Sequence, residues 1–265
     1  VAYKIGIPYY VFNFTGDFHE KVISRFVSSY EHGLTPNPCI DCNRYLKFEY
    51  LYKRAQELGY DYVVTGHYAR IESDEATGRQ LLKKALDDTK DQSYVLYSMT
   101  GEQLSHTLFP LGGMHKTEVR ELAEAHDFIN AAKHDSQDIC FVQNGSYAEF
   151  IENYTGKKYP EGDFIDMSGN ILGRHKGIIR YTIGQRKGLG LSLKEPLYVM
   201  AVNPEDNTVV LGSDSDLFST TLTAKDINLI SIDKIDKPMR VKAKVRYRHH
   251  EQWATVSQTD EDTIE

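Results

Sequence analysis

The run Tyr62-Val63-Val64-Thr65-Gly66-His67 consists of β-branched and aromatic residues that end in a glycine and a histidine. Its composition predicts a short buried strand over residues 62–65. The segment before it predicts a helix from Arg44 to Leu58, which Asn43 caps and Gly59 ends. That helix is indicated by apolar residues at helical spacing: Leu46, Tyr50, Leu51, Ala55 and Leu58.

Further upstream, the β-rich run Ile7–Phe14 predicts another strand, and Asp17 is expected to cap a helix that extends to about Tyr30. The order strand, helix, helix, strand is typical of a parallel sheet flanked by helices. Ligands of such sheets bind outside the carboxyl ends of the strands. Gly66 and His67 directly follow a strand, so we expect them at this edge, where His67 fits a ligand contact and a polar strand end equally well.

The remaining sequence predicts a change of architecture. Ala69–Ile71 and Gln80–Lys84 flank the turn Thr77-Gly78 and predict a hairpin, and helices are expected at residues 90–99, 116–126 and 146–154. From Gly162 onward, glycine, threonine and alternating strands dominate, and a strand run after residue 219 resembles a small barrel. We therefore predict three domains: an α/β domain with a parallel sheet (1–144), a small β-rich domain (145–218) and an incomplete β-barrel (219–265).

The composition excludes several classes of protein. Of the 265 residues, 40% are apolar and 26% are charged, which is ordinary for a globular protein. The sequence has no run of about 18 apolar residues to cross a membrane, and no charged-then-apolar leader opens it. Three cysteines, an odd number, argue against a secreted disulfide scaffold. We expect a cytoplasmic protein with no membrane partner.

The three cysteines stand in two distinctive settings, Thr35-Pro36-Asn37-Pro38-Cys39-Ile40-Asp41-Cys42-Asn43 and Asp135-Ser136-Gln137-Asp138-Ile139-Cys140-Phe141. Cys42 directly precedes the predicted helix start, where backbone amides and the helix dipole favour a thiolate. Three interpretations stay open. The thiols are small buried residues, or Cys39, Cys42 and Cys140 hold a metal or an iron–sulfur cluster, or Cys42 and Cys140 pass sulfur between them and close as a disulfide.

A basic run points to a polyanionic partner. Between residues 240 and 248 every second residue is a cation: Arg240, Lys242, Lys244, Arg246 and Arg248. On a strand this period places five cations on one face. Protection of a sheet edge needs fewer, so RNA or another polyanion is favoured as the partner, although the net charge of the chain is −7.

Taken together, the motifs resemble those of the tRNA-specific 2-thiouridylases, which place sulfur on the wobble uridine of certain tRNAs. The matching stretches run in family order over nearly the whole chain: Gly33-Leu34-Thr35-Pro36-Asn37-Pro38 with Cys42-Asn43, Lys47-Phe48, Thr65-Gly66-His67-Tyr68-Ala69-Arg70, Lys90-Asp91-Gln92-Ser93-Tyr94, Phe109-Pro110-Leu111-Gly112, Lys116-Thr117-Glu118-Val119-Arg120, Asp135 to Phe141, and Tyr181-Thr182-Ile183-Gly184-Gln185-Arg186-Lys187-Gly188-Leu189-Gly190.

The resemblance implies a Rossmann-like catalytic domain related to adenine-nucleotide hydrolases and a sulfur-transfer reaction. ATP, with magnesium, would adenylate the uracil C2 oxygen. Cys140 would receive a persulfide sulfur from a donor protein, and Cys42 would act as nucleophile and resolve the persulfide, leaving a Cys42–Cys140 disulfide. Gly66 would lie against ATP. The residues implied in tRNA binding are Asn37, Pro38 and Cys39 beside the target base, and His67, Lys90, Asp91, Gln92, Arg246 and Tyr247 elsewhere on the tRNA. No metal site is assigned.

Two features depart from the family pattern. The phosphate-binding loop Ser-Gly-Gly-x-Asp-Ser does not occur, and the opening at Val1 reads like the last turn of a helix, so we expect a fragment that binds ATP poorly. Many relatives carry an aspartate, a candidate acid or base, where Cys39 stands here, which leaves that role open. The alternatives are an iron–sulfur-dependent tRNA thiolase that uses all three cysteines, and an inactive tRNA-binding module.

Overall fold

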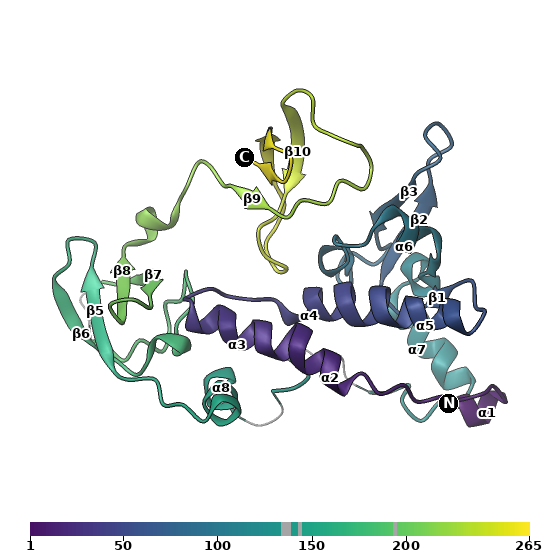
Figure 1. Ribbon diagram of the computed structural model, residues 1–265, viewed down its shortest axis with the longest axis horizontal. Helices are drawn as coiled ribbons and strands as arrows, with labels where there is room; N and C mark the ends of the chain where they lie inside the picture. Colours follow the sequence, from purple (N-terminus) through teal and green to yellow (C-terminus); the bar gives the residue numbers. More distant parts are fainter. Residues whose placement is uncertain (134–138, 143–144, 193–194) are drawn as a thin grey trace. The chain divides into compact units, whose positions relative to one another are not determined.

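The computed structural model describes residues 1–133, 139–142, 145–192 and 195–265 (Figure 1). The chain forms two compact units. The first unit comprises Val1–Gly16, Cys39–Asp135 and Thr221–Glu265, and the second comprises Asp17–Pro38 and Ser136–Thr220. The division into domains 1–144, 145–218 and 219–265 stays a prediction. No helix among the described residues is long and apolar enough to cross a bilayer.

The first unit contains short helices and a parallel pair of short strands. The helices are α1 (Ala2–Ile5), α4 (Pro38–Asp41), the π-helix η2 (Cys42–Tyr50), α5 (Leu51–Glu57), the 3₁₀-helix η3 (Ser93–Val95), α6 (Gly101–Ser105), the 3₁₀-helix η4 (Pro110–Gly113) and α7 (Lys116–Ala125). The parallel strands are β1 (Val63–Val64) and β4 (Thr107–Leu108), which pair Val63 with Thr107. The strand expected at 62–65 is confirmed and its pairing is parallel, but the partner is β4 rather than the strand expected at Ile7–Phe14.

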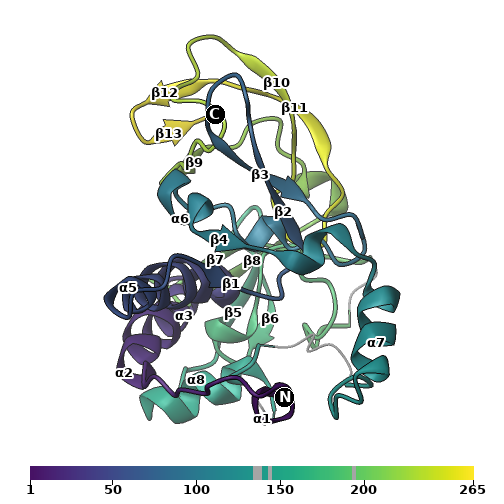
Figure 2. The same ribbon diagram turned by 90° about the vertical axis from the view of Figure 1, so that its right-hand side faces the viewer.

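The other strands of the first unit are antiparallel. They are β2 (Ala69–Ser73) with β3 (Gln80–Lys84), β10 (Met239–Ala243) with β11 (Gln252–Val256), and a three-stranded sheet of β12 (Gln258–Asp260), β13 (Thr263–Ile264) and β9 (Ala224–Lys225). Figure 2 shows β10 and β11 as one extended ribbon. The β2–β3 hairpin confirms the turn predicted at Thr77-Gly78. Within the described residues, β9 to β13 form these separate sheets and do not close a barrel.

Apolar side chains from far-apart segments form the core of the first unit. Phe48 of η2 packs with Ala69 of β2, with Leu104 of α6 and with a cluster that comprises Val95, Leu96, Met99 and Phe109. Gly112 allows the closest approach in this core, because a Cβ atom there would lie 1.7 Å from the carbonyl oxygen of Ala69. The Phe109-Pro110-Leu111-Gly112 motif therefore fixes the backbone beside β2.

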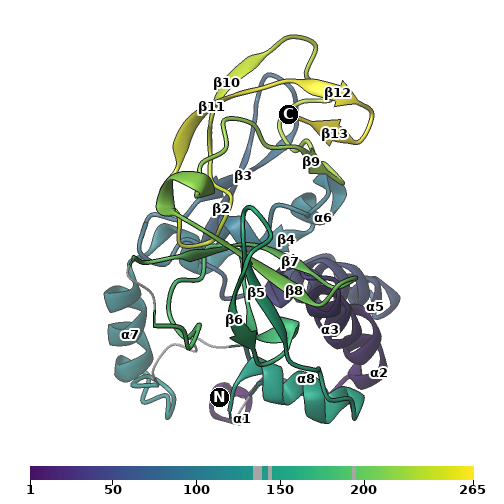
Figure 3. The same cartoon turned by 90° about the vertical axis from the view of Figure 1, so that its left-hand side faces the viewer.

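The second unit packs helices against a four-stranded mixed sheet (Figure 3). Its helices are α2 (Thr15–Phe18, which begins in the first unit), the π-helix η1 (His19–Ile23), α3 (Ser24–Glu31), α8 (Tyr147–Thr155) and the 3₁₀-helices η5 (Ile178–Arg180) and η6 (Asp214–Leu217). The strand order is β6 (Ile171–His175), β5 (Gly162–Asp166), β8 (Thr208–Gly212) and β7 (Tyr198–Asn203), and β5 and β8 are parallel. The sheet is open, so this unit also lacks a closed barrel in its described part.

Three predictions of local structure are wrong. Residues 7–14 form no strand: they are largely exposed, no described strand pairs with them, and Pro8 has no N–H to donate to a ladder. Residues 90–99 are not a helix beyond the short η3, because the carboxylate of Asp91 accepts hydrogen bonds from Ala85 N and Ser93 N and folds the backbone into a turn.

The third error concerns the helix that carries Cys42. It begins at Pro38 rather than after Asn43, since proline suits the first helical position, where no N–H partner is needed. Cys42 therefore lies in the second turn, and the expected stabilisation of its thiolate by a helix N-terminus does not apply. Asn43 is buried and donates from Nδ2 to the carbonyl oxygen of Val95 at 2.9 Å instead of capping the helix.

Candidate active site

Three segments of the first unit that lie far apart in sequence come together around Tyr247. Its hydroxyl donates to the backbone carbonyl of Asp91 at 3.2 Å. Burial raises the pKa of Tyr247, and the neighbouring Asp91 and Cys39 raise it further while Lys90 opposes them. The 90–92 loop and the connection between β10 and β11 therefore share one surface, and Cys39 of α4 lies close enough to affect the pKa of Tyr247. Candidate residues Cys39, Lys90, Asp91 and Tyr247 gather there.

A second tyrosine reinforces this junction. The hydroxyl of Tyr94 donates to the carbonyl oxygen of Val245 at 3.2 Å, and its ring centroid lies 5.9 Å from that of Tyr247. Lys244 places its ammonium 5.5 Å from the Tyr94 centroid and 5.7 Å from the Tyr247 centroid, within the range of cation–π attraction. Sequence reasoning gave no role to Tyr94 or Lys244 individually, because the signal is their contact across about 150 residues of chain.

The three residues Lys90, Asp91 and Gln92 differ in what their side chains do. Asp91 accepts from Ala85 and Ser93, and Gln92 accepts from the backbone N–H of Tyr68 at 3.0 Å. These two side chains therefore hold the loop in shape. Lys90 supplies the positive charge of the trio at a partly exposed position. A direct role of each in tRNA binding stays a prediction.

His67 is buried at the carboxyl end of β1, with 8% of its surface exposed. Its ring packs against Phe48 and Phe109, its Nδ1 lies 2.8 Å from Thr65 Oγ1, and its Nε2 lies 3.3 Å from Lys47 Nζ. Burial lowers the pKa of His67 to about 4, and the charge of Lys47 contributes in the same direction. Since an ammonium can only donate, Nε2 accepts and Nδ1 carries the proton of the neutral ring.

Gly66 lies where the sequence predicts, directly after β1 and exposed at the carboxyl edge. A Cβ atom added there would meet only Leu111 Cδ1, at an ordinary contact distance of 3.5 Å. The backbone at this edge is therefore open to a ligand, and packing alone does not require a glycine.

The cysteines differ in exposure. Cys39 is exposed and Cys42 is half-buried, both on the continuous α4–η2 helix of the first unit. Pro38 is buried at the start of that helix, and Asn37 precedes it with intermediate exposure. Among the described residues, no group of three His, Cys, Asp or Glu side chains is arranged to hold a metal ion. The iron–sulfur alternative therefore gains no support from the described part of the chain.

Cys140 belongs to the second unit and is exposed on a tight turn. The turn is closed by a hydrogen bond of 2.9 Å from Val142 N to the carbonyl oxygen of Ile139. Its flanking residues Ile139 and Phe141 pack into the hydrophobic cluster, and the Phe141 ring lies 5.2 Å from that of Phe26. The packing of Ile139 and Phe141 thus fixes the turn while the Cys140 thiol stays exposed. The acidic residues of this motif fall in 134–138, outside the described residues.

The basic run 240–248 is not one strand. β10 ends at Ala243, and residues 244–249 turn toward β11, because Tyr94 and Asp91 engage Val245 and Tyr247 in side-chain-to-backbone bonds. The expected row of five cations on one strand face is therefore wrong. Arg246 and Tyr247 lie in the connection between the strands, and Arg240 and Lys242 stay on the ribbon.

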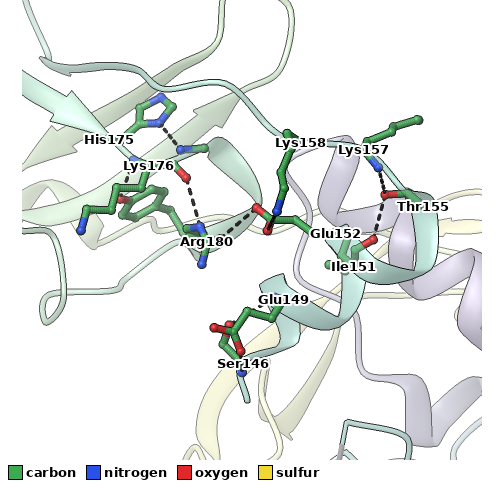
Figure 4. A network of polar contacts seen from close by, with 12 residues as sticks. Ser146, Glu149, Ile151, Glu152, Thr155, Lys157, Lys158, His175, Lys176 and Arg180 are labelled. Carbon is green, nitrogen blue, oxygen red and sulfur yellow. Dashed lines mark hydrogen bonds and ion pairs between the residues drawn. The ribbon is translucent and has the colours of Figure 1, made fainter. Parts of the chain in front are cut away.

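The basic segment 173–190 of the second unit is partly neutralised within the protein. Arg174 pairs with Asp163 at 2.8 Å, and Arg180 pairs with Glu152 at 2.9 Å, where Lys158 approaches the same carboxylate (Figure 4). These ion pairs brace β5 against β6 and α8 against η5. They reduce the charge that this segment can offer to a polyanion.

Comparison with known proteins identifies the family. The model of the tRNA methyl transferase HUP domain matches residues 1–144, and that of the tRNA methyl transferase PRC-barrel domain matches residues 148–213. A tRNA-specific 2-thiouridylase MnmA of Clostridioides difficile (strain 630) is 53% identical over 264 residues, which is 100% of this chain and 73% of the relative. The HUP model agrees with the expected Rossmann-like α/β class.

Two further relatives carry the same name. The protein of Acetivibrio thermocellus is 52% identical over 256 residues, covering 97% of this chain and 71% of the relative. That of Thermoanaerobacter sp. (strain X514), named tRNA-specific 2-thiouridylase MnmA 1, is 53% identical over 264 residues and covers 100% of this chain and 72% of the relative. The resemblance seen in the motifs is confirmed, and the chain belongs to the tRNA-specific 2-thiouridylase family.

Proposed function

We propose that this chain is a tRNA-uridine 2-sulfurtransferase, which replaces the C2 oxygen of the wobble uridine in tRNA with sulfur. The observation that carries the proposal is the proximity of Cys39, Lys90 and Asp91 to Tyr247 in the first unit, where Cys39 shares a continuous helix with Cys42. This arrangement supports an RNA-binding surface and a reactive thiol on one compact unit. A wobble base lies in a loop, so extruding it costs less than opening a duplex.

The uracil C2 oxygen is a poor leaving group, and ATP with magnesium supplies the adenylyl group that makes it a good one. Gly66 fits this ligand, because its backbone is exposed at the carboxyl end of β1 and carries no side chain that would block close approach. The protein's task at this edge is to hold the nucleotide beside the base and away from water.

Cys140 is the proposed carrier of sulfur. Its exposed thiol would take a sulfane sulfur from a donor protein and become a persulfide, which the outward-facing turn makes accessible to such a partner. The terminal persulfide sulfur would attack C2, a C–S bond would form, and the adenylated oxygen would leave as AMP. The uridine would then be joined to Cys140 through an S–S bond.

Cys42 is the proposed resolving nucleophile. Its thiolate would attack Cys140 Sγ, break that S–S bond and release 2-thiouridine, and the product disulfide Cys42–Cys140 would need two electrons from a thiol reductant before the next turnover. A half-buried position suits a thiol that reacts inside the complex rather than with solvent. This chemistry requires a reducing compartment, and we place the protein in the cytoplasm.

The proposed tRNA contacts include the surface around Tyr247. Asn37, Pro38 and Cys39 would border the target base at the start of α4, and Lys90, Arg246 and Tyr247 would engage the tRNA around it. Asp91 and Gln92 would act by shaping their loop. His67 would act from behind the surface, since it is buried and its Nε2 faces Lys47, which is itself partly exposed.

The decisive experiment replaces Cys140 by serine in the enzyme supplied with ATP, magnesium, tRNA and a persulfide donor. Nucleosides are then analysed by mass spectrometry, which separates exchange of oxygen for sulfur from addition of a methyl group. Cys140→Ser should abolish 2-thiouridine, and Cys39→Ser should leave it measurable. Undiminished 2-thiouridine in Cys140→Ser would refute the assignment.

The same assay tests the alternatives. An iron–sulfur-dependent thiolase would need all three cysteines and would show a visible absorption band after anaerobic reconstitution with iron and sulfide. An inactive binding module would bind tRNA in a salt-sensitive manner without Cys42 and Cys140 and would form no 2-thiouridine in any variant.

A further inference from the structure

The two faces of the β10–β11 ribbon in the first unit differ in chemistry. Lys242 pairs across the strands with Trp253, and Arg240 pairs with Thr255, so these four residues share one face. Val241, opposite Ala254, belongs to the other face. The pleat therefore places the tryptophan among cations rather than among the apolar residues that would form a core.

Trp253 is exposed over 59% of its surface, and it is the single tryptophan of the chain. An indole is costly to leave in water, and its position on the charged face means that burial of the opposite face would not cover it. Tryptophan is strongly enriched at the centres of binding interfaces. Its exposure on this face indicates a contact with a partner.

Two cations lie against this indole. The Arg240 guanidinium carbon and the Lys242 ammonium are each 5.4 Å from the ring centroid, within cation–π range. Neither side chain forms an ion pair within the part of the chain that the structure describes, although Lys242 lies close enough to Glu251 to help lower the pKa of that carboxyl. An aromatic ring thus holds two positive charges on a chain whose net charge is −7.

The cluster continues toward the candidate site. Lys244, two residues after Lys242, lies over Tyr94 and Tyr247, and Tyr247 bonds to Asp91. Cations stacked on aromatic rings therefore recur along the ribbon and its connection. This combination of positive charge with exposed aromatic faces is what proteins use to hold unpaired nucleotides, because phosphates meet the cations and bases stack on the rings.

We propose that Arg240, Lys242 and Trp253 form a second contact for tRNA, in which the cations bind a phosphodiester and the indole stacks on an unpaired base. This inference rests on the proposed function, since it takes tRNA as the nucleic acid. It adds to the candidate surface around Tyr247 a stacking position that lies on the strands themselves.

Indole fluorescence makes the contact directly observable, and subtracting the signal of Trp253→Phe isolates the emission of Trp253 in the complete enzyme. In the complete enzyme, an unmodified tRNA transcript with uridine at the wobble position should quench the emission of Trp253. It should also reduce the quenching constant of acrylamide several-fold. Heparin, which offers charge without bases, should protect the indole much less. Full acrylamide access in the presence of saturating tRNA, or equal protection by heparin, would overturn the proposal.

Variants give an independent measurement. Trp253→Ala should weaken tRNA binding roughly fivefold or more, as expected for loss of one stacked base. Trp253→Phe keeps an aromatic ring and should retain most of the affinity. That result would show that the loss in Trp253→Ala is not caused by misfolding. In the double variant Arg240→Gln with Lys242→Gln, the slope of log affinity against log salt concentration should become shallower by the equivalent of about two phosphate contacts. Lys53→Gln with Lys225→Gln removes the same charge from exposed positions of the same unit and should leave the salt dependence unchanged.

The outcomes also separate this inference from the proposed function. Normal 2-thiouridine formation with an unprotected Trp253 would refute the second contact and leave the function standing. Protection of Trp253 without any 2-thiouridine would support the contact and refute the function. Equal tRNA affinity and salt dependence in the double variant and its control would also refute the contact.

Discussion

Lys47 and His67 face each other in the first unit, with Nζ 3.3 Å from Nε2. The pair joins the helix that carries Cys42 to the end of β1, and burial, with the charge of Lys47 adding to it, lowers the pKa of the imidazole. A neutral imidazole accepts from the Lys47 ammonium without adding a second charge beside it.

This pair predicts a pH dependence of stability. The pKa of His67 is lowered to about 4 in the folded protein, so between that value and the ordinary 6.5 the unfolded state binds more protons. Stability should therefore fall as pH drops from 6.5 toward 4, by up to about 3 kcal/mol from this group. Denaturant unfolding of the wild type and of His67→Gln should show a shallower acid loss in the variant. Parallel curves would contradict the assignment.

Gly112 and Gly113 form a matched pair for testing the core. Gly112→Ala would drive a Cβ atom into the carbonyl oxygen of Ala69, whereas nothing lies within 4 Å of a Cβ atom at Gly113. Thermal unfolding should show a loss of about 1–3 kcal/mol or more for the first substitution and little change for the second. Equal stability of the two variants would mean that β2 and η4 do not approach as described.

Tyr247→Phe removes the hydrogen bond to Asp91 and should loosen the connection between β10 and β11. The net worth of such a bond is about 1 kcal/mol, so tRNA affinity should fall roughly fivefold. The turnover rate at saturating tRNA should stay the same, because the chemistry is carried elsewhere. Tyr10→Phe is the control, since Tyr10 is 65% exposed. A loss of turnover with unchanged affinity would show that Tyr247 takes part in the reaction.

Cys42→Ser should trap the reaction halfway. Without a resolving thiol, the uridine stays joined to Cys140, so a covalent tRNA–protein adduct should accumulate, and a thiol reductant should release it as 2-thiouridine. Denaturing gel electrophoresis with labelled tRNA measures the adduct. The same adduct in Cys140→Ser, or full turnover in Cys42→Ser without added reductant, would reverse or remove the proposed roles.

The sequence predicted those helices and turns that depend on residues close together in the chain. The helices α7 and α8 and the turn at Thr77-Gly78 all follow from patterns within about ten residues. The cysteine settings were equally visible. In contrast, the segment after Lys90 fails as a helix because Asp91 binds Ala85, and the basic strand is interrupted because Tyr94 and Tyr247 bond across more than 150 residues.

The same limit applies to the candidate site. Trp253 carries no motif of its own, and the Lys47-Phe48 motif gave Lys47 no role, so the neighbours of each residue in space give it meaning. For Cys42 a local signal was misleading. Asn43 was assigned as the cap of the helix, whereas the helix begins five residues earlier, at Pro38. Hydrogen bonds between side chains and distant backbone groups cannot be predicted from a short window of sequence.

The second unit is assembled from two segments separated by about a hundred residues, Asp17–Pro38 and Ser136–Thr220. Phe26, Val27 and Tyr30 of α3 pack in a hydrophobic cluster whose other buried members all come from the later segment. At translation rates of about 5–20 residues per second, the apolar face of this helix therefore stays exposed for roughly 5–20 s until the later segment has been synthesised. The newborn chain should consequently depend on a holding chaperone over that interval, and release of a ribosome-stalled product that ends before Cys140 should yield aggregates.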